Sequence, residues 1–146
     1  MRKFFPFCRN PKDPDVIGLA RDMTGMTMME TTMKYMLMLY IDEKGMAAAD
    51  ELAQTKTTAA YTAYTDAMKK AGIWLGGGRL RPTETATLVR MKDGRQQVVD
   101  GPYADTKEQL GGYYMIEAPD MDAALSWAAR CPTAGHGTVE VRPLWY

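Results

Sequence analysis

The sequence VDGPYADTKEQLGGYY, residues 99–114, is the stretch around which the rest of the chain is arranged. Apolar and β-branched residues lead into this stretch and away from it, whereas acidic, basic and glycine residues crowd its middle. A plain hairpin turn needs only a few residues of this kind. We therefore interpret the stretch as a functional loop held between two strands.

The segments on either side of this loop are typical of strands. Residues 85–91 and 96–99 are rich in β-branched residues, and Lys92-Asp93-Gly94-Arg95 joins them. An Asp-Gly pair between two such runs is a strong hairpin signal. After the loop, residues 112–118 predict a further strand.

Further out towards the N-terminus, the chain predicts a strand, a helix and a second strand. Residues 34–41, KYMLMLYI, form an apolar run that is too short for a typical helix and fits a central strand buried on both faces. Residues 47–71 are alanine-rich and place Tyr61, Tyr64, Met68 and Ala71 on one helical face, before the helix stops at Gly72. Residues 73–75 then predict a short strand that runs into a glycine turn at 76–78.

The C-terminal part repeats the pattern. Asp120 is the expected N-cap of a helix that Pro132 ends. The expected buried stripe of that helix consists of Met121, Ala124, Leu125 and Ala128. Residues 138–144 alternate polar and apolar side chains, which predicts a half-exposed last strand.

This element order predicts an α+β protein with a ferredoxin-like split βαβ fold, an antiparallel sheet and an extra β-hairpin. In that fold the helices cover only one face of the sheet. Tyr40, Tyr113 and Met115 indicate that the other face is not wholly polar. We therefore expect a homodimer that stacks two such faces, with a cleft near the interface.

Composition narrows the class of protein. The 146 residues include 18 Lys and Arg against 18 Asp and Glu, so a broad basic surface for nucleic acid is not expected. No apolar run approaches the roughly 20 residues that a membrane span needs. Cys8 and Cys131 lie far apart without metal-ligand spacing, which favours reduced thiols in a cytoplasmic protein.

Residues 1–32 differ from the rest of the chain. Pro and Gly punctuate them, no helical or strand period is sustained, and several methionines offer internal start sites. We expect an extension that is disordered or that reflects a start site set too far upstream, followed by one folded domain over residues 33–146.

Six segments of the chain together resemble the YCII-related proteins, in the bacterial branch named for an Asp-Gly-Pro-Phe motif. The segments are residues 33–37, 71–72, 76–78, 100–103, 106–114 and 137–143. The resemblance implies a ferredoxin-like domain that forms a dimeric α/β barrel, in small cytosolic proteins whose roles are largely unassigned. Wider relatives include small monooxygenases and enzymes that degrade chlorinated aromatics, and some members are associated with extracytoplasmic-function sigma factors.

The sequence departs from the family in two places. Tyr103 replaces the phenylalanine of the name motif and adds a hydroxyl to the loop. A His–Asp pair has been proposed as catalytic in YCII-like proteins, but the single histidine here, His136, lies late in the chain. That pair therefore does not transfer directly to this sequence.

Candidate catalytic residues are Asp100 and His136. Asp100 precedes Gly-Pro, where a carboxylate either acts as a general base or accepts backbone hydrogen bonds in the turn. His136 lies between two glycines, and it is either an acid–base group in the cleft or a surface histidine.

The candidate substrate-binding residues are Lys107, Glu108, Tyr113 and Arg81. Lys107 is a candidate anchor for an anion. Glu108 has an alternative structural role in ion pairs with Arg79, Arg81 or Arg142. We expect no cofactor and no metal, because the sequence has no histidine pair, although Asp100, Glu117, Glu140 and His136 leave a convergent acidic site open.

The sequence supports two classes of function. The first is a YCII-related protein that binds or transforms a small anionic or aromatic molecule, in a cleft built from residues 100–113 and the turn at 76–78. The alternative is a non-catalytic regulatory or interaction module, linked to sigma-factor-dependent transcription. The residues leave open whether the protein is an enzyme.

Overall fold

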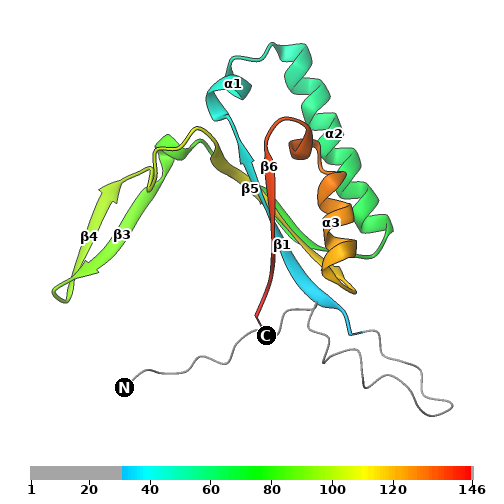
Figure 1. The fold of residues 1–146 in the computed structure, drawn as a ribbon. Helices are drawn as coiled ribbons and strands as arrows, with labels where there is room; N and C mark the ends of the chain where they lie inside the picture. Colours follow the sequence, from blue (N-terminus) through cyan, green and yellow to red (C-terminus); the bar gives the residue numbers. More distant parts are fainter. Residues whose placement is uncertain (1–30, 146) are drawn as a thin grey trace. The chain divides into compact units, whose positions relative to one another are not determined.

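The computed structural model describes residues 31–145, so the extension expected at residues 1–32 lies almost wholly outside the described residues, as does Cys8 (Figure 1). The main sheet has four strands in the order β2-β5-β1-β6, and every neighbouring pair is antiparallel. Its strands are β1 (Met33–Ile41), β2 (Trp74–Arg79), β5 (Gln109–Ala118) and β6 (Thr138–Pro143). This arrangement confirms the ferredoxin-like α+β fold.

The remaining elements are helices, short 3-10 turns and a separate hairpin. They are α1 (Glu43–Ala47), α2 (Glu51–Lys70), α3 (Met121–Ala129), η2 (Thr83–Thr85), η3 (Pro132–Gly135), β3 (Thr87–Lys92) and β4 (Arg95–Asp100). Strands β3 and β4 pair only with each other, which confirms the extra hairpin. Helices α2 and α3 lie along the same face of the main sheet (Figure 1).

Aspartate caps decide where the helices begin. Asp50 accepts a hydrogen bond from the amide of Ala53 at 2.7 Å, and Asp120 caps α3 in the same way through Ala123. The expected start of the long helix at residue 47 was wrong, because the cap at Asp50 separates α2 from the short α1. Gly72 ends α2 with a φ of 72°, as the sequence predicts.

The core lies between the helices and one face of the sheet. Its buried apolar side chains are Tyr35, Leu37, Leu39, Tyr64, Met68, Tyr114, Ile116, Ala118, Ala124, Ala128 and Cys131. Two expected members are not buried: Leu125 is 48% exposed and Ala71 is also exposed. Leu125 is excluded because the short α3 turns Ala124 and Ala128 towards the sheet, which leaves the next position facing away.

The opposite face of the sheet carries large side chains that are only half-buried. They are Met36, Met38 and Tyr40 of β1 and Tyr113 and Met115 of β5. The strand register places Met36 beside Met115 and Met38 beside Tyr113. This face is therefore not wholly polar, as the sequence indicates, although β6 places Thr138, Glu140 and Arg142 on it beside Tyr40, Met38 and Met36. No helix of residues 31–145 lies on this face.

Candidate functional site

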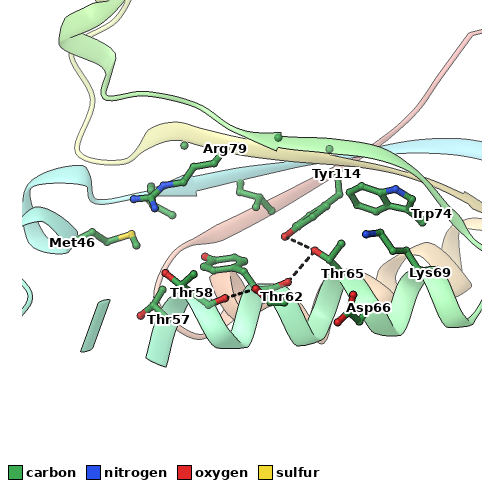
Figure 2. A pocket seen from close by; sticks show the side chains of 17 residues that line it. Met46, Thr57, Thr58, Thr62, Thr65, Asp66, Lys69, Trp74, Arg79 and Tyr114 are labelled. Atoms are coloured by element: carbon green, nitrogen blue, oxygen red, sulfur yellow. Dashed lines mark hydrogen bonds between the residues drawn. The ribbon is translucent and has the colours of Figure 1, made fainter. Parts of the chain in front are cut away.

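A cavity of about 370 Å³ lies between α2 and the helix-facing side of β2 and β5 (Figure 2). Side chains of three kinds line it: aromatic and aliphatic groups, a row of threonines on α2, and a few charged groups. The lining residues are Leu39, Ile41, Met46, Thr57, Thr58, Tyr61, Thr62, Thr65, Asp66, Lys69, Trp74, Gly77, Gly78, Arg79, Gly111, Gly112 and Tyr114. Its volume lies within the range of small-molecule sites.

Glycines leave the room for this cavity. Gly77 pairs with Tyr114 across the β2–β5 ladder, and a Cβ on Gly77 would lie 2.8 Å from Cδ1 of Tyr114. The next row pairs Arg79 with Gly112, where a Cβ would lie 2.8 Å from the carbonyl oxygen of Gly78. The expectation of a glycine turn at 76–78 was therefore wrong: these residues continue strand β2, and at Gly77 the close approach to β5 leaves no room for a side chain.

The threonine row on α2 contributes acceptors more than donors. The hydroxyls of Thr58, Thr62 and Thr65 donate to carbonyl oxygens four residues earlier, at 2.9–3.0 Å. Because each hydroxyl has one proton, these side chains offer the cavity a methyl group and oxygen lone pairs. This wall therefore offers a ligand apolar contact and hydrogen-bond acceptors but few donors.

Tyr114 stands in the middle of the cavity (Figure 2). Its ring packs edge-on against Tyr64 and Trp74, with ring centroids 5.3 Å and 5.7 Å away. Burial raises the pKa of the Tyr114 hydroxyl above its ordinary value, so the proton stays on the oxygen. That hydroxyl has one hydrogen-bond partner among residues 31–145, the hydroxyl of Thr65 at a long 3.5 Å.

Positive groups lie at both ends of the cavity. The Arg79 side chain extends beside Met46 at one end, and Lys69 lies 5.7 Å from the Trp74 ring centroid at the other (Figure 2). Arg79 has no carboxylate within 4.0 Å in the described part of the chain, where the ion pair between Arg142 and Glu140 is the one present. An exposed guanidinium without a protein partner is suited to hold an anion.

A second, outer cavity of about 680 Å³ adjoins the first and shares Arg79, Met46, Thr57 and Thr58 with it. Arg81 and His136 also line the outer cavity. The carboxylate of Glu43 lies there as well, but it accepts hydrogen bonds from the amide and hydroxyl of Thr83. The arginines thus make the outer cavity favourable for an anion.

The candidate site residues chosen from the sequence do not lie together in the structure. Arg81 and His136 lie together in the outer cavity, whereas Asp100 and Lys107 are exposed and line neither cavity. The Asp100 side chain has no hydrogen bond in the described part of the chain. Tyr113 points to the face of the sheet opposite the cavities, since its neighbour Tyr114 points into them.

Glu108 accepts a hydrogen bond from the hydroxyl of Thr138 at 3.0 Å. The expected ion pairs of Glu108 with arginine were therefore wrong, since none joins it to an arginine of the described residues. No three His, Cys, Asp or Glu side chains of residues 31–145 gather in a metal-binding group, so the four candidates do not converge.

Sequence reasoning missed the parts of the site that depend on side-chain packing. Tyr114 was expected only as a strand residue and Arg79 only as an ion-pair partner. The threonines at 58, 62 and 65 share a helical spacing, and this spacing was the available signal that α2 has a second face directed at a cavity.

These features define a class: a ferredoxin-like α+β domain with a cavity between its sheet and its longest helix. The sequence profile of the YCII-related domain matches residues 33–146, and the chain belongs to this family. It is also 36% identical over 118 residues to Uncharacterized protein R00369 of Rhizobium meliloti (strain 1021). That alignment covers 77% of this chain and 92% of the relative.

Within residues 31–145, no helix is both long and apolar enough to cross a membrane.

Proposed function

We propose that this protein binds a small organic anion with an aromatic or apolar body in the cavity beneath α2. The observation that carries the proposal is the Arg79 guanidinium, which lies at the end of an aromatic-lined cavity without a carboxylate partner in residues 31–145. If the anionic group of the ligand binds Arg79, its apolar part would contact Trp74 and Tyr114. Binding energy would come from both contacts.

The outer cavity supports the same ligand class. Arg81 adds positive charge next to Arg79, and His136 is the imidazole that lines this space. We retain His136 as the candidate acid–base group of an enzymatic reaction. Asp100 and Lys107 are candidates only in an assembly that brings the β4–β5 loop to a cleft, because in one chain they are exposed away from the cavities.

The test is a thermal-shift screen of the full chain with small aromatic and aliphatic carboxylates and phosphates. A ligand at a hundred times its dissociation constant adds about 2.7 kcal/mol to the free energy of unfolding, which raises the melting temperature measurably. We expect aromatic carboxylates to stabilise the wild type. Their affinity, calculated from the shift in melting temperature, should be at least tenfold lower in Arg79→Met.

Arg95→Met is the matched control, because Arg95 is exposed on the separate hairpin and lines neither cavity. Stabilisation that survives Arg79→Met, or that is lost equally in Arg95→Met, would argue against the proposal. If no anion in the screen stabilises the protein, the proposed function is wrong.

We further propose that the protein is a homodimer that joins the open faces of its sheets. The support is the row of half-buried apolar side chains on that face, including Met36, Met38 and Tyr113. A two-fold axis would bury the same surface on both copies.

The β3–β4 hairpin favours a second candidate function, an interaction module. Val89, Met91 and Val98 are 55–68% exposed on this hairpin, and neither strand pairs with the main sheet. Exposed apolar groups on a projecting ribbon are typical of a surface that binds another protein.

This second function predicts a partner that co-purifies with the protein from its own cells and is lost in the double variant Val89→Ser, Val98→Ser. Leu52→Ser is the control, since Leu52 is 63% exposed on α2. A partner retained equally by all these proteins would exclude the hairpin as its binding surface.

A further inference from the structure

The cavity beneath α2 has few hydrogen-bond donors that are not already used by the protein. Thr58, Thr62 and Thr65 donate to the backbone of their own helix, and the hydroxyl of Tyr61 is hydrogen-bonded to that of Thr133 at 2.8 Å. The donors left for a ligand include Arg79 with Thr57 at one end, Lys69 and the indole N–H of Trp74 at the other, and the hydroxyl of Tyr114 between them (Figure 2).

The Tyr114 hydroxyl differs from the other free donors because it is desolvated. Tyr114 is 8% exposed, whereas Arg79 and Lys69 are both exposed to solvent. Thr65 has a closer acceptor for its single proton, the carbonyl oxygen of Tyr61 at 2.9 Å, so its 3.5 Å contact with Tyr114 is weak. A buried donor whose nearest acceptor, the Thr65 oxygen, is 3.5 Å away gains little from that hydrogen bond, and a closer acceptor supplied by a ligand would add to the binding energy.

The surroundings of Tyr114 decide what kind of acceptor fits. Its hydroxyl lies in a cavity lined by Leu39 and Trp74, and its ring touches Tyr64, so a charged oxygen there would lose its hydration without a positive partner. A neutral oxygen needs only the one hydrogen bond that Tyr114 has to give. The charged group of the ligand is better held at the exposed Arg79.

We propose that Tyr114 is a specificity-determining residue, and that the ligand is an aromatic acid with a neutral oxygen acceptor, such as a ketone, remote from its carboxylate. The carboxylate binds Arg79, the ring lies against the glycine strand β2, and the neutral oxygen accepts the hydrogen bond from Tyr114. This inference rests on the proposed function and narrows its ligand class from small organic anions to keto-substituted aromatic acids.

The experiment compares probes that differ only at this oxygen. Binding of meta- and para-acetylbenzoate to the full chain is measured by titration calorimetry against meta- and para-ethylbenzoate, which keep the ring, the carboxylate and the two-carbon substituent but lack the acceptor oxygen. We expect one acetyl isomer to bind about five- to tenfold more tightly than its ethyl counterpart, the usual effect of one neutral hydrogen bond. Tyr114→Phe should abolish that preference and leave the affinity for ethylbenzoate unchanged.

Tyr64→Phe is the matched control. It also removes one buried tyrosine hydroxyl, but that hydroxyl donates to the backbone oxygen of Trp127 and Tyr64 does not line the cavity. The acetyl preference should persist in this variant. Circular dichroism checks that both variants fold. If Tyr114→Phe does not fold, equal binding of the acetyl and ethyl probes by the wild type still overturns the role of Tyr114.

The outcomes separate this inference from the proposed function. Equal binding of acetyl and ethyl probes by the wild type, or a preference that survives Tyr114→Phe, overturns the role of Tyr114. If Arg79→Met still weakens all four probes in that case, the proposed function stands. If none of the probes binds the wild type, both proposals for this cavity fail for aromatic acids.

Discussion

Gly112 and Gly76 lie on the same pair of strands but in opposite environments. A Cβ on Gly112 would lie 2.8 Å from the carbonyl oxygen of Gly78, closer than side-chain carbons normally approach backbone atoms. A Cβ on Gly76 would meet nothing within 4 Å. The absence of a side chain is therefore essential at Gly112 and incidental at Gly76.

We expect Gly112→Ala to lower the free energy of unfolding by about 2 kcal/mol, because strand β2 must shift away from β5. Gly76→Ala should leave it unchanged or raise it by up to ~1 kcal/mol, since the unfolded chain loses freedom. Urea denaturation of both variants checks this difference. Equal midpoints for the two variants would contradict the close β2–β5 packing.

At the scale of single residues, the sequence predicted residues of the outer cavity better than residues of the inner cavity. Arg81 and His136, both chosen from the sequence, line the same outer cavity. Arg79 and Tyr114 were not chosen as ligand-binding residues. They are candidates because, within residues 31–145, Arg79 has no carboxylate partner and the Tyr114 hydroxyl has only a long hydrogen bond. Both facts follow from side-chain packing, which a residue pattern does not record.

At the scale of elements, the strands and helices that carry strong periodic patterns were predicted well. The apolar run that became β1 and the capped helix α3 are examples, although β1 is fully buried on one face and not on both as predicted. The predictions were wrong where a strand partner far away in the sequence determines the backbone conformation. The glycines of β2 suit a turn, but pairing with β5 keeps them extended, and the same ladder starts β5 at Gln109, before its predicted start.

The β3–β4 hairpin is the element with the least support from the rest of the protein. All residues of β4 are exposed, and a two-stranded ribbon is marginally stable alone in water. We expect its backbone amides to exchange with solvent deuterium at least a hundredfold faster than those of β1 and β5 in the sheet.

Hydrogen exchange followed by mass spectrometry makes this comparison, and peptides from the α2 region provide an internal reference. Protection of the hairpin equal to that of β1 would contradict the expectation. It would mean that another molecule, such as a second copy of this chain, covers the hairpin in solution.

At the scale of the whole molecule, the proposed homodimer would bury the open face of the sheet. We expect Met38→Lys to convert a dimer into a monomer, because the register places Met38 beside Tyr113 in the centre of that face. Leu52→Lys, at a side chain 63% exposed on α2, should not change the mass. Sedimentation velocity gives both masses, and a wild-type monomer or an unchanged Met38→Lys dimer would count against this interface.

Alkaline pH should unfold the whole domain. Burial raises the pKa values of Tyr61, Tyr64 and Tyr114 above 10.0 and that of the Cys131 thiol above 9.0. The folded state thus holds these protons more tightly than the unfolded state. Stability is unaffected near neutral pH and falls as pH rises, first above 9 through Cys131 and then above 10 through the tyrosines.

Urea midpoints at about pH 8 and about pH 11 measure this loss, with the tyrosinate absorbance recorded in parallel. Tyr64→Phe should be less stable than the wild type near neutral pH, since the carbonyl oxygen of Trp127 loses its donor, but it should lose less stability between the two pH values. An equal loss in both proteins would exclude Tyr64 from the alkaline transition.

The position of β1 in the sheet has a consequence for the synthesis of the protein. Strand β1 is made first, yet its partners are β5 and β6, whose residues reach Ala118 and Pro143. At typical translation speeds, roughly ten seconds pass between the appearance of β1 and the completion of β6. Until β5 is complete, the methionine-rich strand has no neighbour in the main sheet, so its apolar side chains are open to contact with other chains.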